Sequence, residues 1–301
     1  MSAKRFFDQE TPTRIGLTLA RLVPRWLAGI ICRLLAVLGV LIKTDVYRAI
    51  TANLRHVLPD ASPRTIAWLR YRAFYNAARA YYDFFHNVAT DKDPSCFVPP
   101  VRLAPGARER FDQALEQGRG VLVLGCHVSN FDLGGEAMPK LLGLKSEIQY
   151  LSIANPTPSM AFFNRLRESQ PGIRITPVSP ASLKQAIRHL RAGGVVTTGM
   201  DRPLDENDEP VVFFGFPTRL PCGYLRLQRL SGCVVIAAGA HYAHGYYEID
   251  FTGPLPWSET GDAAYDDEVN KRTVLSHLEA FIRRAPDQWM MFVPVWPDEH
   301  D

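Results

Sequence analysis

The order of apolar and polar residues divides the chain into two parts. Before residue 98 the apolar residues recur at helical spacing or form one long run, and after it short apolar runs alternate with amphipathic stretches. The pattern predicts a helical segment over residues 1–97 and an α/β core over residues 98–301, the latter forming one structural domain. A Pro-rich stretch at 98–105 separates the two parts.

The strand signals of the second part are short apolar runs separated by amphipathic sequence. They lie at residues 121–125, 148–153, 195–198, 233–240 and 247–251. The clearest helix between them follows Ser179, which suits an N-cap, and ends near Gly193. Alternating strands and helices predict a central mixed, largely parallel sheet flanked by helices. Ligands of such sheets bind at the carboxyl ends of the strands.

The longest apolar run of the first part extends from Trp26 to Ile42, and only Arg33 interrupts it. Its 17 residues are fewer than the roughly 20 that a spanning helix needs, and a central Arg costs about 2.5 kcal/mol or more. No small-residue cleavage site follows, which disfavours a signal peptide. We consider a helix lying in the membrane interface, with basic flanks on lipid phosphates, and a buried core helix. The run alone does not decide between spanning a membrane and lying on it.

A further helix is predicted from Arg64 to His86, where aromatic residues follow helical spacing. Trp68, Tyr71 and Tyr75 fall near one face of this helix. Aromatic residues beside arginines can stack on single-stranded nucleic acid, or they can pack in a core. Helical spacing favours packing against a neighbouring helix, and no nucleic-acid partner is expected.

The composition is that of a globular protein, with 47% hydrophobic and 22% charged residues. The net charge of +3 is unevenly distributed, because residues 1–80 hold 13 Lys and Arg against 4 Asp and Glu. This basic segment indicates an anionic partner surface or, alternatively, ordinary solvated helix faces. The five cysteines form no CxxC pair, which argues against a disulfide framework or a zinc site and favours a reducing compartment.

The residues best suited to chemistry follow the first strand of the core, VLVLG. His127 stands just after this strand and Asp132 five positions later, ahead of a glycine pair. A His at the end of a buried strand can face a cleft, and a nearby carboxylate can orient its imidazole and raise its basicity. The N-terminus of a following helix can stabilise an oxyanion. The alternative is a packed His with a capping Asp nearby.

Other catalytic motifs are missing from the sequence. It contains no GxSxG, Walker-type, HExxH or GxGxxG motif. Cys126, next to His127, suggests a thiol nucleophile, but adjacent strand residues point to opposite faces. We therefore expect the Cys126 thiol to be buried.

The segment GCHVSNFD resembles the His-x4-Asp/Glu motif of the bacterial acyltransferases that act on lipid A precursors and phosphatidylinositol mannosides. Four later stretches resemble further motifs of that family in order: ANPTPSMAFFNRLRESQPG, LRAGGVVTTGMDRP, VVFFGFPTRLPCGYLRLQRLSG and APDQWMMF. NLRHVLPDASP resembles its helical lead-in. The resemblance covers roughly residues 10–296, and the ordered series is more specific than any one motif.

The resemblance implies roles for particular side chains. His127 would be the general base on the acceptor hydroxyl, Asp132 its orienting partner, and Asp201 a supporting group. The residues expected to bind a substrate phosphate or the phosphopantetheine arm of a donor are Arg165, Arg167, Arg202, Arg219 and Asn155. Arg202 and Arg219 are equally well explained as surface arginines.

The implied reaction moves a fatty acyl group from a thioester of CoA or acyl carrier protein to a hydroxyl of a lipid or glycolipid, with no metal and no other cofactor. The implied location is the cytoplasmic face of the inner membrane, with the N-terminal helical segment docking peripherally or monotopically. The Phe-Pro-Glu-Gly-Thr-Arg box of glycerol-phosphate acyltransferases is absent, which disfavours a lysophosphatidate acceptor. Acceptor, chain length, donor and oligomeric state stay open. Alternatives are an esterase or thioesterase with the same residue pair, and an inactive lipid-binding protein.

Overall fold

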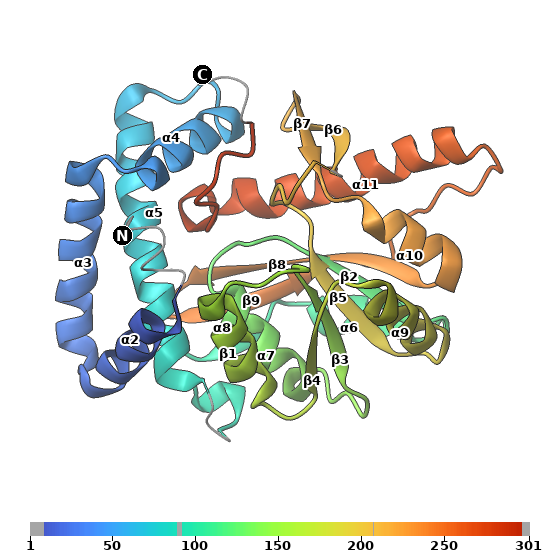
Figure 1. Ribbon diagram of the computed structural model, residues 1–301, viewed down its shortest axis with the longest axis horizontal. Helices are drawn as coiled ribbons and strands as arrows, with labels where there is room; N and C mark the ends of the chain where they lie inside the picture. Colours follow the sequence, from blue (N-terminus) through green and yellow to red (C-terminus); the bar gives the residue numbers. More distant parts are fainter. Residues whose placement is uncertain (1–8, 89–91, 207, 297–301) are drawn as a thin grey trace.

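The computed structural model describes residues 9–88, 92–206 and 208–296 (Figure 1). Its N-terminal part is helical, as predicted, and three of its helices contact the long helix α5. The helices are α2 (Glu10–Leu22), α3 (Arg25–Ile42), α4 (Asp45–Val57) and α5 (Pro63–Asn87). A short 3-10 helix, η1 (Pro94–Cys96), leads into the second part.

The second part is built on a sheet that, within the described residues, has seven strands in the order β1-β9-β8-β2-β5-β3-β4. The strands are β1 (Val101–Leu103), β2 (Val121–Gly125), β3 (Ile148–Ser152), β4 (Ile173–Pro177), β5 (Val195–Gly199), β8 (Val234–Ala243) and β9 (Tyr246–Phe251). Neighbouring strands run parallel except for β8 and β9. The predicted mixed, largely parallel sheet is therefore confirmed.

Helices cover both faces of this sheet because successive strand residues point to opposite sides. Leu122 and Leu124 pack against α9 (Pro180–Arg191), α10 (Gly223–Ser231) and α11 (Ala263–Arg284). Val121 and Val123 pack on the other side, against α5 and three helices of the second part. These three helices are α6 (Ala107–Leu115), α7 (Phe131–Leu141) and α8 (Pro158–Glu168).

Some elements were not expected from the sequence. They are β1, β4, the separate hairpin of β6 (Glu209–Phe213) and β7 (Phe216–Leu220), and the 3-10 helix η2 (Pro286–Gln288). β4 alternates buried residues with Arg174 and Thr176 at the edge of the sheet, so it lacks a continuous apolar run. Only buried central strands carry that run.

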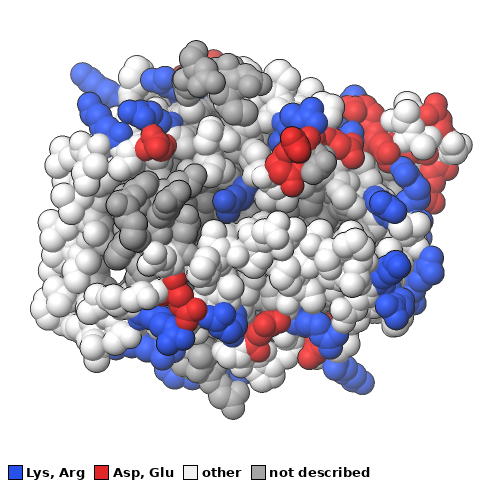
Figure 2. All heavy atoms as spheres, in the orientation of Figure 1, with Lys and Arg blue, Asp and Glu red and all other residues white. Residues whose placement is uncertain are grey.

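Helix α3 lies along α5 at one side of the molecule and leaves its large apolar residues uncovered (Figure 1). It contacts α5 through small residues. At Gly39 the two helices are so close that an added Cβ would come within 2.6 Å of the Phe74 ring. Trp26 is 71% exposed, and the other exposed large apolar residues of α3 are Ile30, Leu34, Leu35, Val37, Leu38, Leu41 and Ile42. Figure 2 shows this edge largely free of charged groups, with basic side chains above it. The core-helix interpretation is therefore wrong, although α3 is long and apolar enough to pass as a membrane span.

The aromatic stripe of α5 is only partly a core feature. Trp68 is 56% exposed, and the buried face of the helix carries instead Ile66, Leu69, Ala73, Ala77, Ala80 and Phe84. The guanidinium of Arg72 lies 5.0 Å from the centre of the Trp68 ring. The expectation that Trp68 packs in the core was wrong, because small residues fill the close contacts between helices.

Candidate active site

His127 and Asp201 meet at the carboxyl ends of two adjacent parallel strands. Each lies two positions beyond its strand, and the register of β2 with β5 aligns Gly125 with Gly199. His127 Nδ1 and Asp201 Oδ1 are 2.6 Å apart, which is hydrogen-bonding distance for a charge-assisted pair. Strand order therefore brings together two side chains 74 positions apart in sequence.

Asp201 is completely buried and has a donor for each carboxylate oxygen. Its Oδ2 accepts from the His127 backbone N–H at 2.8 Å and from the indole N–H of Trp289 at 2.7 Å. Burial favours the neutral acid, but the attraction of His127 and the hydrogen bonds outweigh it and hold the pKa of Asp201 below its ordinary value. Asp201 is therefore an ionised acceptor, which assigns the proton to His127 Nδ1 and leaves Nε2 free to accept another.

The imidazole of His127 is held between a glycine and an aromatic ring, with 26% of its side chain exposed. Phe131 meets it edge-on with ring centres 4.8 Å apart. On the other side a Cβ at Gly199 would lie 2.8 Å from the ring carbon Cε1, which is too close for any side chain. Gly199 therefore creates the space in which the imidazole lies.

The structure corrects the expected partner of His127. Asp132 lies in the first turn of α7 and forms an ion pair with Arg167 of α8 at 2.5 Å. In the part of the chain that the structure describes, the carboxylate on the His127 ring is that of Asp201 and not that of Asp132. The spacing predicted the wrong carboxylate because a helix begins at Phe131 and directs Asp132 towards α8.

One turn further along α7, Glu136 is a buried carboxyl with neither oxygen hydrogen-bonded among the described residues. Burial, reinforced by the negative charge of Asp132, raises the pKa of Glu136 to about 9. The Nε of Arg167 is likewise buried and without a hydrogen-bond partner in the described residues. Asp132, Arg167 and Glu136 thus form a second polar cluster, less well bonded than the pair of His127 and Asp201.

The other predicted binding residues are dispersed. Arg165 pairs with Glu10 of α2 at 2.7 Å, and Arg219 lies exposed on β7 with a long contact to the Glu206 backbone. Asn155 is exposed in the loop after β3. Arg202, next to Asp201, is half-buried and makes no ion pair or hydrogen bond within the described residues. Of the predicted arginines, Arg167 and Arg202 therefore fit a binding role best.

Trp289 was not singled out from the sequence, although it belongs to the APDQWMMF stretch. Only the tertiary structure brings its indole to Asp201, 88 positions away. Cys126 is buried as expected, and burial raises the pKa of its thiol, so the nucleophilic thiolate is disfavoured. Among the described residues, no group of three or more His, Cys, Asp or Glu side chains is arranged to hold a metal ion.

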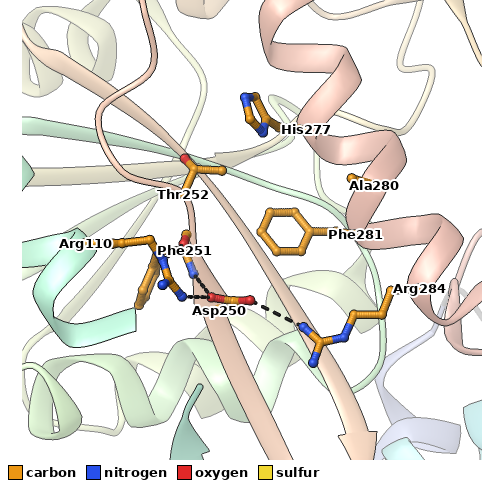
Figure 3. A pocket seen from close by; sticks show the side chains of 8 residues that line it. All are labelled: Arg110, Asp250, Phe251, Thr252, His277, Ala280, Phe281 and Arg284. Carbon is orange, nitrogen blue, oxygen red and sulfur yellow. Dashed lines mark hydrogen bonds and ion pairs between the residues drawn. The ribbon is translucent and has the colours of Figure 1, made fainter. Parts of the chain in front are cut away.

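A cavity of about 400 Å³ lies elsewhere, between α6, the end of β9 and α11 (Figure 3). Figure 3 shows Asp250 between Arg110 and Arg284, at 2.5 and 3.3 Å, with His277 further away. Both of its arginines are paired with Asp250, as in a structural ion-pair cluster. The cavity does not include His127 or Asp201.

Comparison with known proteins shows the family to which the chain belongs. No curated protein matches the chain. The family model described as bacterial lipid A biosynthesis acyltransferase matches residues 13–297, nearly the whole chain. The family predicted from the resemblance is thereby confirmed, and the chain belongs to the bacterial lipid A biosynthesis acyltransferase family.

Proposed function

We propose that the protein transfers a fatty acyl group from an acyl thioester to a hydroxyl of a lipid or glycolipid, with His127 as general base and Asp201 as its orienting partner. The observation that carries this proposal is the 2.6 Å contact between His127 Nδ1 and the buried carboxylate of Asp201. Family membership supports lipid acyl transfer as the reaction class.

The geometry supports a simple sequence of proton transfers. His127 Nε2 takes the proton of the acceptor hydroxyl as that oxygen attacks the thioester carbonyl. When the carbon–sulfur bond breaks, the imidazolium returns the proton to the thiolate, so the products are an ester and a free thiol. The ionised Asp201 stabilises the imidazolium during this interval.

Two arginines near the pair support binding of a phosphate-bearing substrate. Asp132 holds the Arg167 guanidinium, and Arg202 follows Asp201 directly and forms no ion pair within the described chain. Arginine guanidinium groups bind phosphate through paired hydrogen bonds. Phosphates occur on CoA, on the phosphopantetheine of acyl carrier protein and on lipid acceptors, so these residues fit either donor.

The uncovered face of α3 supports docking on a membrane surface. The helix also carries exposed basic residues, Arg33 within it and Lys43 at its C-terminal end, and such a helix binds anionic interfaces through burial of apolar area and attraction to lipid phosphates. Because α3 packs along α5, which is itself part of the folded body, we propose that it lies on the membrane rather than crossing it. The cytoplasmic face of the inner membrane is the proposed location.

The test uses purified protein, palmitoyl-CoA or palmitoyl-acyl carrier protein as donor, and lipid extract from a bacterial inner membrane as acceptor. We expect His127→Ala to lower ester formation by roughly 10³-fold or more, while circular dichroism stays unchanged. His277→Ala, in the separate cavity, is the control and should retain activity.

Product analysis by mass spectrometry separates the alternatives. A new acyl ester supports transfer, whereas free fatty acid without any ester would indicate a thioesterase or esterase. Lipid binding without turnover in the wild-type protein would indicate an inactive lipid-binding protein. Wild-type rates in His127→Ala would refute the assignment of the base.

A further inference from the structure

The segment after η2 runs antiparallel to the catalytic loop. Residues Val128 and Trp289 form a β-bridge, with the Ser129 N–H donating to the Gln288 carbonyl and the Met290 N–H donating to the His127 carbonyl, each at 2.7 Å. Ser129 has a φ of +59°, so the loop turns sharply at this point. The C-terminal segment therefore holds the backbone on which His127 is mounted.

Trp289 adds a side-chain contact to this backbone pairing. Its indole is 4% exposed, and its N–H donates to Asp201 Oδ2 at 2.7 Å. The same oxygen accepts from the His127 backbone, so Oδ2 is fully engaged and Oδ1 is directed at the imidazole. Without the indole donor the carboxylate could rotate about its χ2 torsion, which is a soft degree of freedom.

We propose that Trp289 is a positioning residue for the acyl transfer, acting through its indole hydrogen bond to fix the carboxylate of Asp201 against the His127 imidazole. This inference rests on the proposed role of His127 as base. Trp289 touches Asp201 rather than the reacting atoms.

The position of Trp289 is itself determined by neighbouring anchors. Gln288 exchanges two hydrogen bonds with the backbone of Tyr242 on β8, at 2.7 and 3.0 Å. Asp287 accepts from Arg72 and Asn76 of α5, at 2.8 and 3.0 Å. The segment is thus tied both to the sheet and to the N-terminal helices, which makes it a rigid support.

The chain contains a matched control for the indole hydrogen bond. Trp296 is as buried as Trp289, and their ring centres lie 6.4 Å apart in the same aromatic cluster. Its indole nitrogen, however, has no hydrogen-bond partner among the described residues. The change of Trp to Phe removes similar apolar area at both positions, but only at position 289 does it remove a donor to Asp201.

The experiment compares Trp289→Phe with Trp296→Phe and His127→Ala in the assay described above. We expect Trp289→Phe to lower kcat about 10-fold to 100-fold with KM changed less than about threefold, the range for losing a hydrogen bond to a charged group. Trp296→Phe should stay within about threefold of wild type. Because the indole donates to the carboxylate that faces the imidazole, its loss should move the acid limb of the kcat/KM profile in Trp289→Phe and leave that limb in place in Trp296→Phe.

A substrate-independent readout is the downfield proton resonance of the hydrogen bond between His127 and Asp201 in the NMR spectrum. It should shift in Trp289→Phe and not in Trp296→Phe. If Trp289→Phe does not fold, benzothienylalanine at position 289 retains the indole shape and replaces the N–H by sulfur, and the same kinetic loss is expected.

The outcomes separate this inference from the proposed function. Equal losses in the two Trp variants, an unmoved pH profile, or a loss confined to KM would overturn the positioning role, while an inactive His127→Ala would leave the base assignment standing. Full activity in His127→Ala would remove the proposed function and with it the basis of this inference.

Discussion

The outer face of α3 and the carboxyl edge of the sheet both depart from the usual distribution, in which large apolar side chains are buried and charged side chains are exposed. On α3, large apolar side chains such as Leu34 and Leu41 lie at the surface, and nothing in the described chain covers them. At the sheet edge, the charged Asp201 lies completely buried. The difference shows that hydrogen bonds within the protein can compensate a buried charge, whereas an exposed apolar face is compensated only by another apolar phase.

The same contrast appears on a smaller scale between Asp201 and Glu136. Both carboxyls are buried, but Asp201 receives donors on both oxygens and Glu136 receives none among the described residues. Their pKa values consequently move in opposite directions, that of Asp201 downward and that of Glu136 upward to about 9. Burial alone therefore does not determine which carboxyl is available as an ionised partner.

The largest effect is expected where the buried charge is removed. In Asp201→Asn, the amide oxygen of the new side chain can still accept from the His127 backbone N–H and from the Trp289 indole. The amide N–H₂ then faces His127 Nδ1. That contact favours the tautomer with the proton on Nε2, so the base is lost, and kcat should fall roughly 10²-fold to 10⁴-fold in the steady-state assay.

The control for this change is Asp132→Asn. It removes the ion pair with Arg167 but touches no atom of the His127 ring, so we expect a higher KM for the phosphate-bearing substrate and a kcat within a few-fold of wild type. An equal loss of kcat in both variants would contradict the pairing of His127 with Asp201 rather than Asp132.

The next largest effect is expected at the exposed apolar face of α3. Replacing Leu34 and Leu38 together by Glu should weaken binding to anionic phosphatidylglycerol vesicles about 100-fold, because burying two leucines contributes about 3 kcal/mol or more. Co-sedimentation measures the binding. Leu204 and Val212, similarly exposed but away from α3, are the matched pair, and their replacement by Glu should change binding less than about threefold. Equal losses would mean that α3 is not the docking face.

The smallest effect concerns stability and its dependence on pH. The unfolded chain ionises Glu136 near 4.5, whereas the folded chain keeps its proton up to about 9, so the folded state binds more protons between these values and stability falls as pH rises. Glu136→Gln has no such proton to retain. The free energy of unfolding of this variant, relative to that of the wild type, should therefore rise by about 1 kcal/mol or more between pH 5 and pH 8.

Urea denaturation at the two pH values measures that difference. Glu116→Gln, at an exposed position of the chain, is the control and should show no growth with pH. A flat difference for Glu136→Gln would mean that water or another group satisfies this carboxyl in solution.

Much of the architecture could be predicted from local pattern. The apolar runs beginning at Val121, Val195 and Tyr247 became strands, and Ser179 caps α9 with its side chain as expected. His127 was a candidate for chemistry because a polar imidazole follows a buried strand, and the family resemblance implied its role as base. Asp201 occupies the same position after β5, so the shared offset from two apolar runs was a usable signal for their meeting.

The sequence by itself determined the alternation of strands and helices, the long apolar helix and the place of His127, because these depend on periodicity within a few residues. Only the tertiary structure decided that β5 lies beside β2, that Asp132 turns towards Arg167, and that Trp289 reaches Asp201 across 88 positions of the sequence. Those contacts depend on strand order and helix packing, which join residues far apart in sequence and leave no periodic trace along it.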